Sequence, residues 1–199
     1  MKKATAKAPS NIAFIKYWGR KDEKLRLPAN DSLSMNLSNV FTITTVEFSP
    51  LLKNDRVEMV GGINEEGEER IIAHLDRVRR RAGTTLSARV RTKNNFPPGT
   101  GIASSASGFA ALTLAATTAA GLKLSRRELS ILTRQGSGSA CRSIPDGFVE
   151  WKAGSSSQTS YAYSLFPPSW WQMSDIIATC GETSKKITYS EGPVFVEGS

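Results

Sequence analysis

The 199-residue sequence predicts an α+β protein in which helices are layered on one sheet. Two long segments, Thr5–Trp18 and Ser32–Phe48, are rich in β-branched and apolar residues, as is typical of strands. A nearly all-apolar segment, Ser104–Ala120, is stopped by Gly121 and predicts a helix whose faces are all buried. Strands and helices do not alternate strictly along the chain, which favours α+β over a parallel α/β sheet.

The other elements follow from turn and capping signals. Pro28, Asn30 and Asp31 break the chain between the two long strands. Ser125 and Glu128 have capping-box spacing and predict a helix from Ser125 to Thr133. The polar segment 154–160 is interpreted as a hairpin loop. We further expect a helix over Gly67–Arg81 and strands over Arg56–Val60, Leu86–Thr92, Gly147–Lys152, Ser160–Leu165 and Asp175–Cys180.

Composition describes an ordinary globular protein with a strongly basic balance. The residues are 39% hydrophobic and 22% charged, and the net charge is +8. This charge favours a polyanionic partner, either nucleic acid, an anionic membrane face or a phosphorylated small molecule. The densest basic run, Arg77 and Arg79–Arg81, ends a predicted helix and is interpreted as a solvated face. Because basic residues are otherwise scattered without interleaved aromatics, we expect no nucleic-acid partner.

The few cysteine and histidine residues and the short apolar segments argue against a zinc protein, a disulfide-rich protein and a membrane protein. Cys141, Cys180 and the single histidine, His74, provide neither a zinc-ligand set nor a disulfide framework. No run approaches the roughly 18 apolar residues of a membrane span, and no apolar segment of signal length follows the N-terminal lysines. We therefore expect a cytoplasmic protein with no membrane partner.

The segment Asn94–Phe109 has the pattern of an anion-binding loop. Gly99 and Gly101 allow close backbone approach, so that main-chain N–H groups can turn toward a phosphate. Ser104 and Ser105 then open a helix, whose unpaired N–H groups and dipole favour the same ligand. A serine-capped helix after a tight turn is the alternative. The spacing matches neither the P-loop nor the dinucleotide fingerprint.

A second cluster, Lys16–Lys21, places three cations and two aromatic residues after an apolar strand. Exposed cations there could bind an anion, with Gly19 freeing the turn. The alternative is a strand end that puts Trp18 in the core and its lysines in solvent.

A third cluster, Gly136–Ser143, combines hydroxyl groups with Arg142 just after a helix. The planar guanidinium can bind two oxygens of a diphosphate at once, although a glycine-rich turn between helices is an equal alternative. Cys141 is interpreted as a small buried residue, because no histidine lies near it in the sequence. Together the three clusters favour phosphate chemistry by positioning and electrostatics rather than by a catalytic triad.

Four motifs in order, Ala8–Ala13, Lys16–Gly19, Pro97–Ala106 and Ser137–Ser143, resemble the diphosphomevalonate decarboxylase family of the GHMP kinase superfamily. The Pro97–Ala106 motif alone also fits homoserine kinase, galactokinase or mevalonate kinase. The Lys16–Gly19 and Ser137–Ser143 motifs narrow the resemblance to the decarboxylase family. It implies a GHMP-type N-terminal domain of the ribosomal protein S5 domain 2-like fold over residues 1–170. Residues 171–199 would begin a truncated C-terminal domain.

The resemblance also implies a reaction and its site residues. ATP with Mg²⁺ would phosphorylate the 3-hydroxyl of mevalonate 5-diphosphate, and phosphate and carbon dioxide would then leave to give isopentenyl diphosphate. Lys16 and Arg142 would be catalytic, no side chain is assigned directly to the metal, and relatives are commonly homodimers. Substrate binding is assigned to Tyr17, Trp18, Gly19, Arg20, Arg70, Ser137, Gly138, Ser139, Ala140, Cys141 and Arg142. The ATP phosphates are assigned to Gly101, Ile102, Ala103, Ser104, Ser105, Ala106 and Ser107.

Several positions depart from the family pattern. Arg20 stands where lysine is usual, Ile102 where leucine is usual, and Asp146 takes the first place of a usual glycine pair. Pro193 replaces a residue usually inside a helix. The family aspartate that orients or deprotonates the 3-hydroxyl belongs to a second half that these 199 residues do not include, which predicts negligible turnover by this chain. The alternatives are a mevalonate or phosphomevalonate 3-kinase or decarboxylase variant, or a non-catalytic nucleotide-binding remnant.

Overall fold

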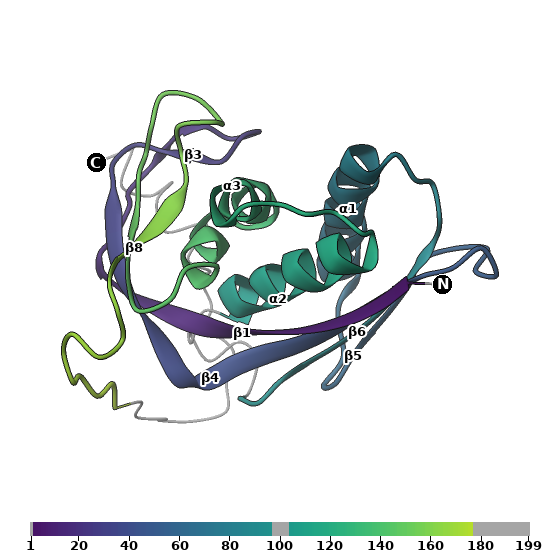
Figure 1. Cartoon of the computed structure of the whole chain (residues 1–199), viewed down its shortest axis with the longest axis horizontal. Helices are drawn as coiled ribbons and strands as arrows, with labels where there is room; N and C mark the ends of the chain where they lie inside the picture. Colours follow the sequence, from purple (N-terminus) through teal and green to yellow (C-terminus); the bar gives the residue numbers. More distant parts are fainter. Residues whose placement is uncertain (1, 97–103, 177–199) are drawn as a thin grey trace.

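The computed structural model describes residues 2–96 and 104–176, which form a mixed sheet with helices on one face (Figure 1). Strand β4 (Ser32–Phe48) is the centre of the sheet and has the bounds that the sequence predicts. It pairs antiparallel with β1 (Lys2–Ile15) along nearly its whole length. On its other edge, the C-terminal half of β4 pairs with β6 (Ala88–Asn94) and the N-terminal half with β7 (Phe148–Trp151). The antiparallel pairing explains why both long segments carry strand-type residues.

Two further strands extend this sheet. β5 (Arg56–Met59) pairs parallel to β6, and β8 (Ala162–Phe166) pairs antiparallel to β7. The 154–160 segment connects β7 to β8, which confirms the predicted hairpin loop. The strand expected over Asp175–Cys180 lies mostly outside the described residues, and its first two residues carry no regular structure.

Three helices, α1 (Glu65–Ala82), α2 (Ser104–Ala119) and α3 (Arg126–Gly136), cover the same face of the sheet (Figure 1). Alternate β4 residues face them, because side chains along a strand point to opposite sides. Buried side chains from the helices and the sheet form one core: Val46, Phe48, Leu75, Val78, Val90, Phe109, Leu112 and Leu132. Helix α2 lies between the sheet and the other helices and is buried on nearly all sides, as its apolar sequence predicts.

Local signals set the helix ends. The Asn64 side chain accepts from the Gly67 N–H at 3.1 Å and starts α1, and Gly83 ends it with φ 63°. The capping box predicted at Ser125 and Glu128 is present at the start of α3. After α3, the segment expected as a possible turn forms a short 3₁₀ helix, η1 (Gly138–Ser143).

The structure corrects two expectations. The first strand ends at Ile15, and the chain then forms a hairpin of β2 (Arg20–Asp22) and β3 (Leu27–Pro28) that the sequence did not predict. The solvated-face interpretation is wrong for Arg79, whose side chain is 11% exposed and forms ion pairs with Asp55 and Asp76. Its apolar stem and buried charge help to close the end of α1 against the sheet.

Candidate functional site

A cavity of about 200 Å³ lies between the start of α1, the start of α2 and strands β4 and β6. Three of its polar residues are Arg70 on α1 and Ser104 and Ser105 on α2. Apolar residues line much of the rest: Met59, Ile63, Ile71, Val90, Phe109 and Leu112. The cavity therefore combines an apolar wall with a few polar groups, which is the usual form of a small-molecule site.

The start of α2 is suited to an anion. Its first turn contains no acidic residue, whereas α1 begins with three glutamates and α3 with Glu128. Ser105 is exposed and Ser104 is half-buried, so both can reach a ligand in the cavity. Unpaired N–H groups and the helix dipole favour negative charge at this end.

The other residues predicted to bind ATP divide into two groups. Gly101, Ile102 and Ala103 lie outside the described residues. Ala106 and Ser107 are fully buried. The Ser107 hydroxyl accepts hydrogen bonds from Thr42 at 2.7 Å and Ser10 at 3.2 Å, and thus fixes α2 to β1 and β4.

Arg70 faces the cavity with part of its hydrogen-bonding capacity unused. Its guanidinium carbon lies 5.2 Å from the centre of the Phe109 ring. Its Nε is buried and has no hydrogen-bond partner among the described residues. A buried N–H of this kind favours a ligand that can accept from it.

The loop after β1 places Tyr17 and Trp18 in different environments. Tyr17 is buried and contacts Trp151 edge to face, with ring centres 4.9 Å apart. Trp18 is 50% exposed, so the alternative that put it in the core is wrong. Gly19 has φ 70°, which a larger residue rarely adopts and which turns the chain into β2.

Asn30 holds this loop and was missed by the sequence analysis. Its side chain accepts from the Trp18 N–H at 3.0 Å and donates to the Lys16 carbonyl at 3.0 Å. Lys16 itself is half-buried, and nearby Arg20 forms an ion pair of 2.5 Å with Glu23. The sequence pattern marks Asn30 only as a residue that breaks the strand, although asparagine side chains commonly bond backbone groups in this way.

Arg142 on η1 is buried and donates hydrogen bonds to the neutral side chains of Asn11 and Ser32. Its Nε and Nη2 each donate to Asn11 Oδ1 at 3.2 Å, and its Nη1 donates to Ser32 Oγ at 2.6 Å. Asn11 in turn donates to Ser143 Oγ at 2.8 Å and to the Ser139 carbonyl at 3.2 Å. Asn11 falls in the Ala8–Ala13 motif but has no predicted role in the site, and the only signal for Ser32 is its polarity within a strand pattern.

Close packing brings η1 to the Tyr17 loop. A Cβ at Gly138 would lie 3.2 Å from the Trp151 ring and 3.4 Å from the Tyr17 hydroxyl. Cys141 is fully buried, and this burial is the main reason that the pKa of its thiol is raised to about 12. A thiol that stays protonated agrees with the interpretation of Cys141 as a small buried residue. Ser137 and Ala140 are also buried, whereas Ser139 is half-buried.

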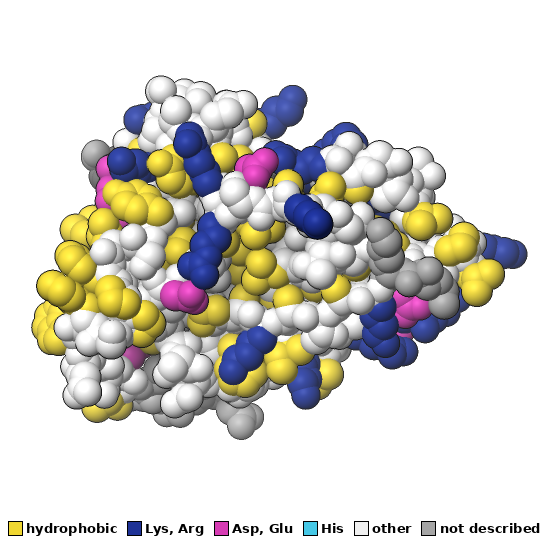
Figure 2. All heavy atoms as spheres, in the orientation of Figure 1, with side chains coloured by type: hydrophobic (Ala, Val, Ile, Leu, Met, Phe, Trp, Pro, Cys, Tyr) yellow, Lys and Arg dark blue, Asp and Glu magenta, His cyan; other side chains and the backbone are white. Residues whose placement is uncertain are grey.

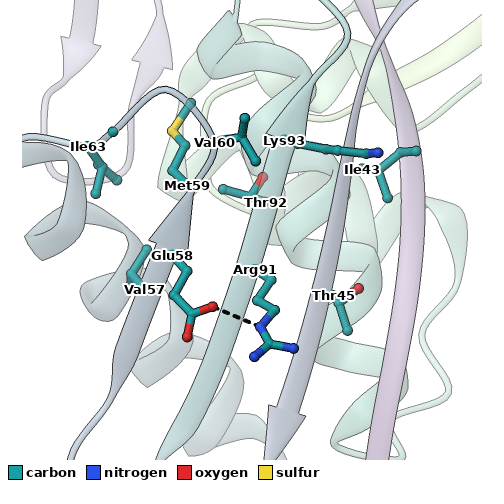
Figure 3. A pocket seen from close by; sticks show the side chains of 11 residues that line it. Ile43, Thr45, Val57, Glu58, Met59, Val60, Ile63, Arg91, Thr92 and Lys93 are labelled. Atoms are coloured by element: carbon teal, nitrogen blue, oxygen red, sulfur yellow. Dashed lines mark hydrogen bonds and ion pairs between the residues drawn. The ribbon is translucent and has the colours of Figure 1, made fainter.

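A second hollow of about 540 Å³ lies at the β5–β6 edge of the sheet (Figure 3). None of the predicted site residues lines it. Its charged residues include Glu58 and Arg91, which form an ion pair at 2.8 Å. The first cavity is therefore the better candidate site.

Residues 2–96 and 104–176 contain neither a metal-ligand cluster nor a membrane-spanning helix. No group of three or more His, Cys, Asp or Glu side chains is positioned there to hold a metal ion. None of the helices in this part of the chain combines the length and apolar character needed to cross a membrane.

Comparison with known proteins identifies the family. The chain is 39% identical over 209 residues to diphosphomevalonate decarboxylase mvd1 of Aspergillus fumigatus, covering 96% of this chain and 52% of that protein. The mevalonate diphosphate decarboxylase from Enterococcus faecalis superposes with a TM-score of 0.79 at 44% identity, over 85% of this chain and 53% of the other. A structure of MDDEF in complex with MVAPP, AMPPCP and magnesium gives a TM-score of 0.80 at 44% identity, over 85% and 52% of the two chains.

These likenesses confirm the fold that the sequence resemblance implied. The chain spans about half the length of the curated relatives it matches. The family model for the diphosphomevalonate decarboxylase-like N-terminal domain matches residues 8–162. The chain therefore belongs to the diphosphomevalonate decarboxylase-like family and contains its N-terminal domain.

Proposed function

We propose that this chain binds ATP and mevalonate 5-diphosphate side by side, for ATP-dependent decarboxylation to isopentenyl diphosphate. One observation carries the proposal: Arg70 from α1 and Ser104 and Ser105 from the start of α2 line the same cavity. A cation and a helix start are both anion-binding elements, so two phosphorylated molecules can meet there. The MDDEF complex with MVAPP and AMPPCP supports this pairing of ligands.

ATP places its phosphates at the start of α2 and its base against the apolar wall of the cavity. Ser104 and Ser105 contribute hydroxyl groups and backbone N–H groups to the phosphates. When bound, Mg²⁺ neutralises phosphate charge. Mg²⁺ keeps several waters and takes most of its other ligands from the substrate phosphates, so the hydroxyls of Ser104 and Ser105 are the oxygens of this cavity's helix start that could complete its shell.

Mevalonate 5-diphosphate lies between α1, the Tyr17 loop and η1. Arg70 and Arg20 bind its diphosphate, and the exposed ring of Trp18 covers its carbon chain. Ser139 and Arg142 on η1 face its carboxylate end, with Asn11 and Ser32 fixing the direction of the guanidinium. Lys16 and Arg142 supply positive charge where the reaction changes bonds.

The reaction then has two stages. The 3-hydroxyl gives its proton to the base that the family resemblance places outside these 199 residues, its oxygen attacks the γ-phosphorus of ATP, and ADP leaves. The bond from C3 to the new phosphate next breaks, while the electrons of the C1–C2 bond form the C2–C3 double bond and carbon dioxide departs. Phosphorylation turns a poor leaving group into a good one, and nearby cations stabilise the charge that develops.

Calorimetric titration tests the binding of each ligand. We expect the 199-residue chain to bind AMPPCP with Mg²⁺ and to bind mevalonate 5-diphosphate. Arg70→Gln should weaken mevalonate 5-diphosphate binding by about 10- to 100-fold, since a charge-assisted hydrogen bond is worth about 1.5–3 kcal/mol. Arg81→Gln, which removes the same charge from the exposed end of α1, is the matched control and should bind normally.

Turnover tests the reaction class. ATP-dependent release of carbon dioxide is measured with mevalonate, its monophosphate and its diphosphate. Because these 199 residues lack the family aspartate, we expect little release, and the most with the diphosphate. Phosphorylation without release of carbon dioxide would instead favour a 3-kinase. A folded chain that binds neither AMPPCP nor mevalonate 5-diphosphate overturns the proposal.

A further inference from the structure

Trp151 on β7 is a buried ring at the end of the sheet that also carries exposed apolar side chains. Figure 2 shows hydrophobic side chains gathered on the surface around β8 and the segment after it, where Phe166 and Trp171 are exposed. Trp151 is not part of this surface, because it is 1% exposed and is the largest of the fully buried side chains in the described residues. Since protein interiors are close-packed, a buried ring of this size constrains the groups that pack against it.

Three residues assigned to the substrate contact the Trp151 ring. The Tyr17 ring meets it edge to face, with ring centres 4.9 Å apart. The guanidinium carbon of Arg142 lies 5.9 Å from the centre of the same ring. Gly138 packs against it so closely that an added Cβ would lie 3.2 Å from the ring. The loop after β1 and the η1 helix therefore share one contact surface, which is the Trp151 indole.

A hydrogen bond at the edge of the indole fixes its orientation. Trp151 Nε1 donates to Ser160 Oγ at 3.1 Å, and Ser160 Oγ donates in turn to the Lys152 carbonyl at 3.0 Å. Ser160 is fully buried and lies just before β8. A buried indole N–H that loses its acceptor gains no water in exchange, so this bond favours one orientation of the ring.

Arg134 on α3 holds Ser160 in place and connects it to the β2–β3 hairpin. Arg134 is fully buried, its Nη1 donates to the Ser160 carbonyl, and its Nε donates to the Leu25 carbonyl at 3.1 Å. These contacts form a continuous path from the hairpin through Arg134 and Ser160 to the Trp151 ring. The support of the indole is thus itself fixed by the core.

We propose that Trp151, oriented by Ser160, is a positioning residue that holds the loop after β1 and the η1 helix in the arrangement that binds mevalonate 5-diphosphate. This inference rests on the proposed function, because it concerns the same substrate. The nucleotide is proposed to bind at the start of α2, in a cavity that neither Trp151 nor Ser160 lines. A change at the indole should therefore alter the affinity for mevalonate 5-diphosphate and spare the affinity for nucleotide.

Calorimetric titrations with mevalonate 5-diphosphate and with AMPPCP and Mg²⁺ test the proposal. Ser160→Ala leaves the indole N–H without its acceptor. We expect this variant to bind mevalonate 5-diphosphate about tenfold more weakly and to change AMPPCP affinity by less than about twofold. Trp151→Phe keeps an apolar ring without the N–H and should have the same effect. Thermal melts identify any variant that fails to fold, and Trp151→Phe remains a test if Ser160→Ala does so.

Two controls separate positioning from a general loss of packing. Ser160→Thr keeps a hydroxyl group at the same place and should recover most of the affinity that Ser160→Ala loses. Thr117→Ala removes another buried hydroxyl, which donates to the Thr113 carbonyl at 2.7 Å within α2, and should leave both affinities unchanged.

A pair of variants tests the contact between η1 and the ring directly. Gly138→Ala adds a methyl group against the indole and should weaken mevalonate 5-diphosphate binding. Trp151→Phe in the same chain leaves room for that methyl group. We therefore expect the combined loss to be smaller than the product of the two separate losses, whereas independent effects would multiply and contradict the contact.

The outcomes distinguish this inference from the proposed function. If the unaltered chain binds mevalonate 5-diphosphate and both Ser160→Ala and Trp151→Phe bind it equally well, the inference is wrong and the proposed function stands. If the unaltered chain does not bind this ester, the proposed function fails and the inference fails with it. Equal losses for the ester and for AMPPCP would also contradict the inference, because they would show general damage to the fold.

Discussion

His74 is enclosed where α1, α2 and α3 meet. It is fully buried, its Nε2 lies 2.8 Å from the Thr113 hydroxyl, and its Nδ1 has no hydrogen-bond partner in the described part of the chain. Burial, and to a smaller extent the charge of Arg77, lowers the pKa of the imidazole to about 3. The ring is therefore neutral in the folded protein at any pH near neutrality.

This shift makes stability depend on pH in a defined direction. Below about pH 6.5 the unfolded chain protonates His74 while the folded chain does not, so acid favours unfolding. The contribution of His74 to the free energy of unfolding is therefore zero above about pH 6.5 and becomes increasingly destabilising as the pH falls toward 3. Relative to His74→Gln, we expect the unaltered chain to lose about 1.4 kcal/mol of unfolding free energy per pH unit between about pH 6 and 4.

Urea unfolding at several pH values measures this difference. The sequence has a single histidine, so no other imidazole contributes to it. Carboxylates titrate in both proteins and cancel in the comparison. Parallel pH profiles for the two proteins would contradict the prediction.

Gly136, at the end of α3, is required by close packing rather than by its backbone angles. A Cβ there would lie 2.5 Å from a carbon of the Phe109 ring and 2.7 Å from His74 Nδ1. Gly136→Ala should therefore destabilise the protein by about 1–3 kcal/mol, as overpacking does. Gly108→Ala is the matched control in α2, since no atom lies within 4 Å of its added methyl group, and it should be neutral or stabilising. Denaturant titration that finds the two variants equally stable would contradict this account.

Asp146 and Gly147 show how a departure from the family pattern is tolerated. Gly147 has φ 79°, and a side chain there would overlap the Phe166 carbonyl, so glycine is needed. Asp146 before it is exposed and forms a 3.5 Å ion pair with Arg126 at the surface. The usual first glycine of the pair is therefore replaceable at this position, whereas the second is not.

A negative charge at the start of α2 should have opposite effects on helix stability and on ligand binding. Glutamate at an exposed first-turn position interacts favourably with the helix dipole, by about 0.3–1 kcal/mol. At Ser105 the same charge would repel ATP phosphates held in the cavity. We therefore expect Ser105→Glu to preserve or raise the melting temperature and to abolish AMPPCP binding.

The neutral variant Ser105→Gln provides the control for size. It should fold normally and keep most of the nucleotide affinity, because the backbone N–H groups remain. Calorimetry and thermal melts on the same samples report both quantities. If Ser105→Glu still binds AMPPCP with unchanged affinity, the phosphates do not lie at this helix start.

The sequence predicts elements whose causes are local. The helix from Ser125 carries its own capping box, and strand β4 carries its own pattern, so both are found as expected. The β2–β3 hairpin and η1 depend on distant partners instead: Arg134 bonds the Leu25 carbonyl, and Asn11 bonds the Ser139 carbonyl. A sequence separation of 109 or 128 residues leaves no periodic signal to detect.

The candidate site is assembled from four separate parts of the chain. Lys16–Arg20, Arg70, Ser104–Ser105 and Ser139–Arg142 are distant in the sequence. Arg70, Ser104 and Ser105 line one cavity, and Gly138 on η1 packs close to Tyr17, but no residue of the Tyr17 loop or η1 lines that cavity. Residue chemistry suggested three anion-binding clusters, but only resemblance to a family suggested Arg70.

Excess positive charge over the whole protein sets how binding responds to salt. The net charge is +8, and the proposed ligands are polyanions. Ligand that binds only the folded state stabilises it by about 2.7 kcal/mol at a concentration 100 times its dissociation constant. For a chain of this size, that corresponds to a rise in melting temperature of about 5–10 °C.

We expect mevalonate 5-diphosphate to raise the melting temperature by this amount at low salt. At about 1 M salt and the same ligand concentration the rise should be much smaller, because screening shortens the range of charge interactions to about 3 Å. Melting curves at several salt concentrations measure the effect, and mevalonolactone, which is uncharged, serves as the control ligand. A shift that persists unchanged in high salt would mean that apolar contacts, rather than the arginines, hold the substrate. The screening test thus separates an electrostatic site from an apolar one without depending on turnover.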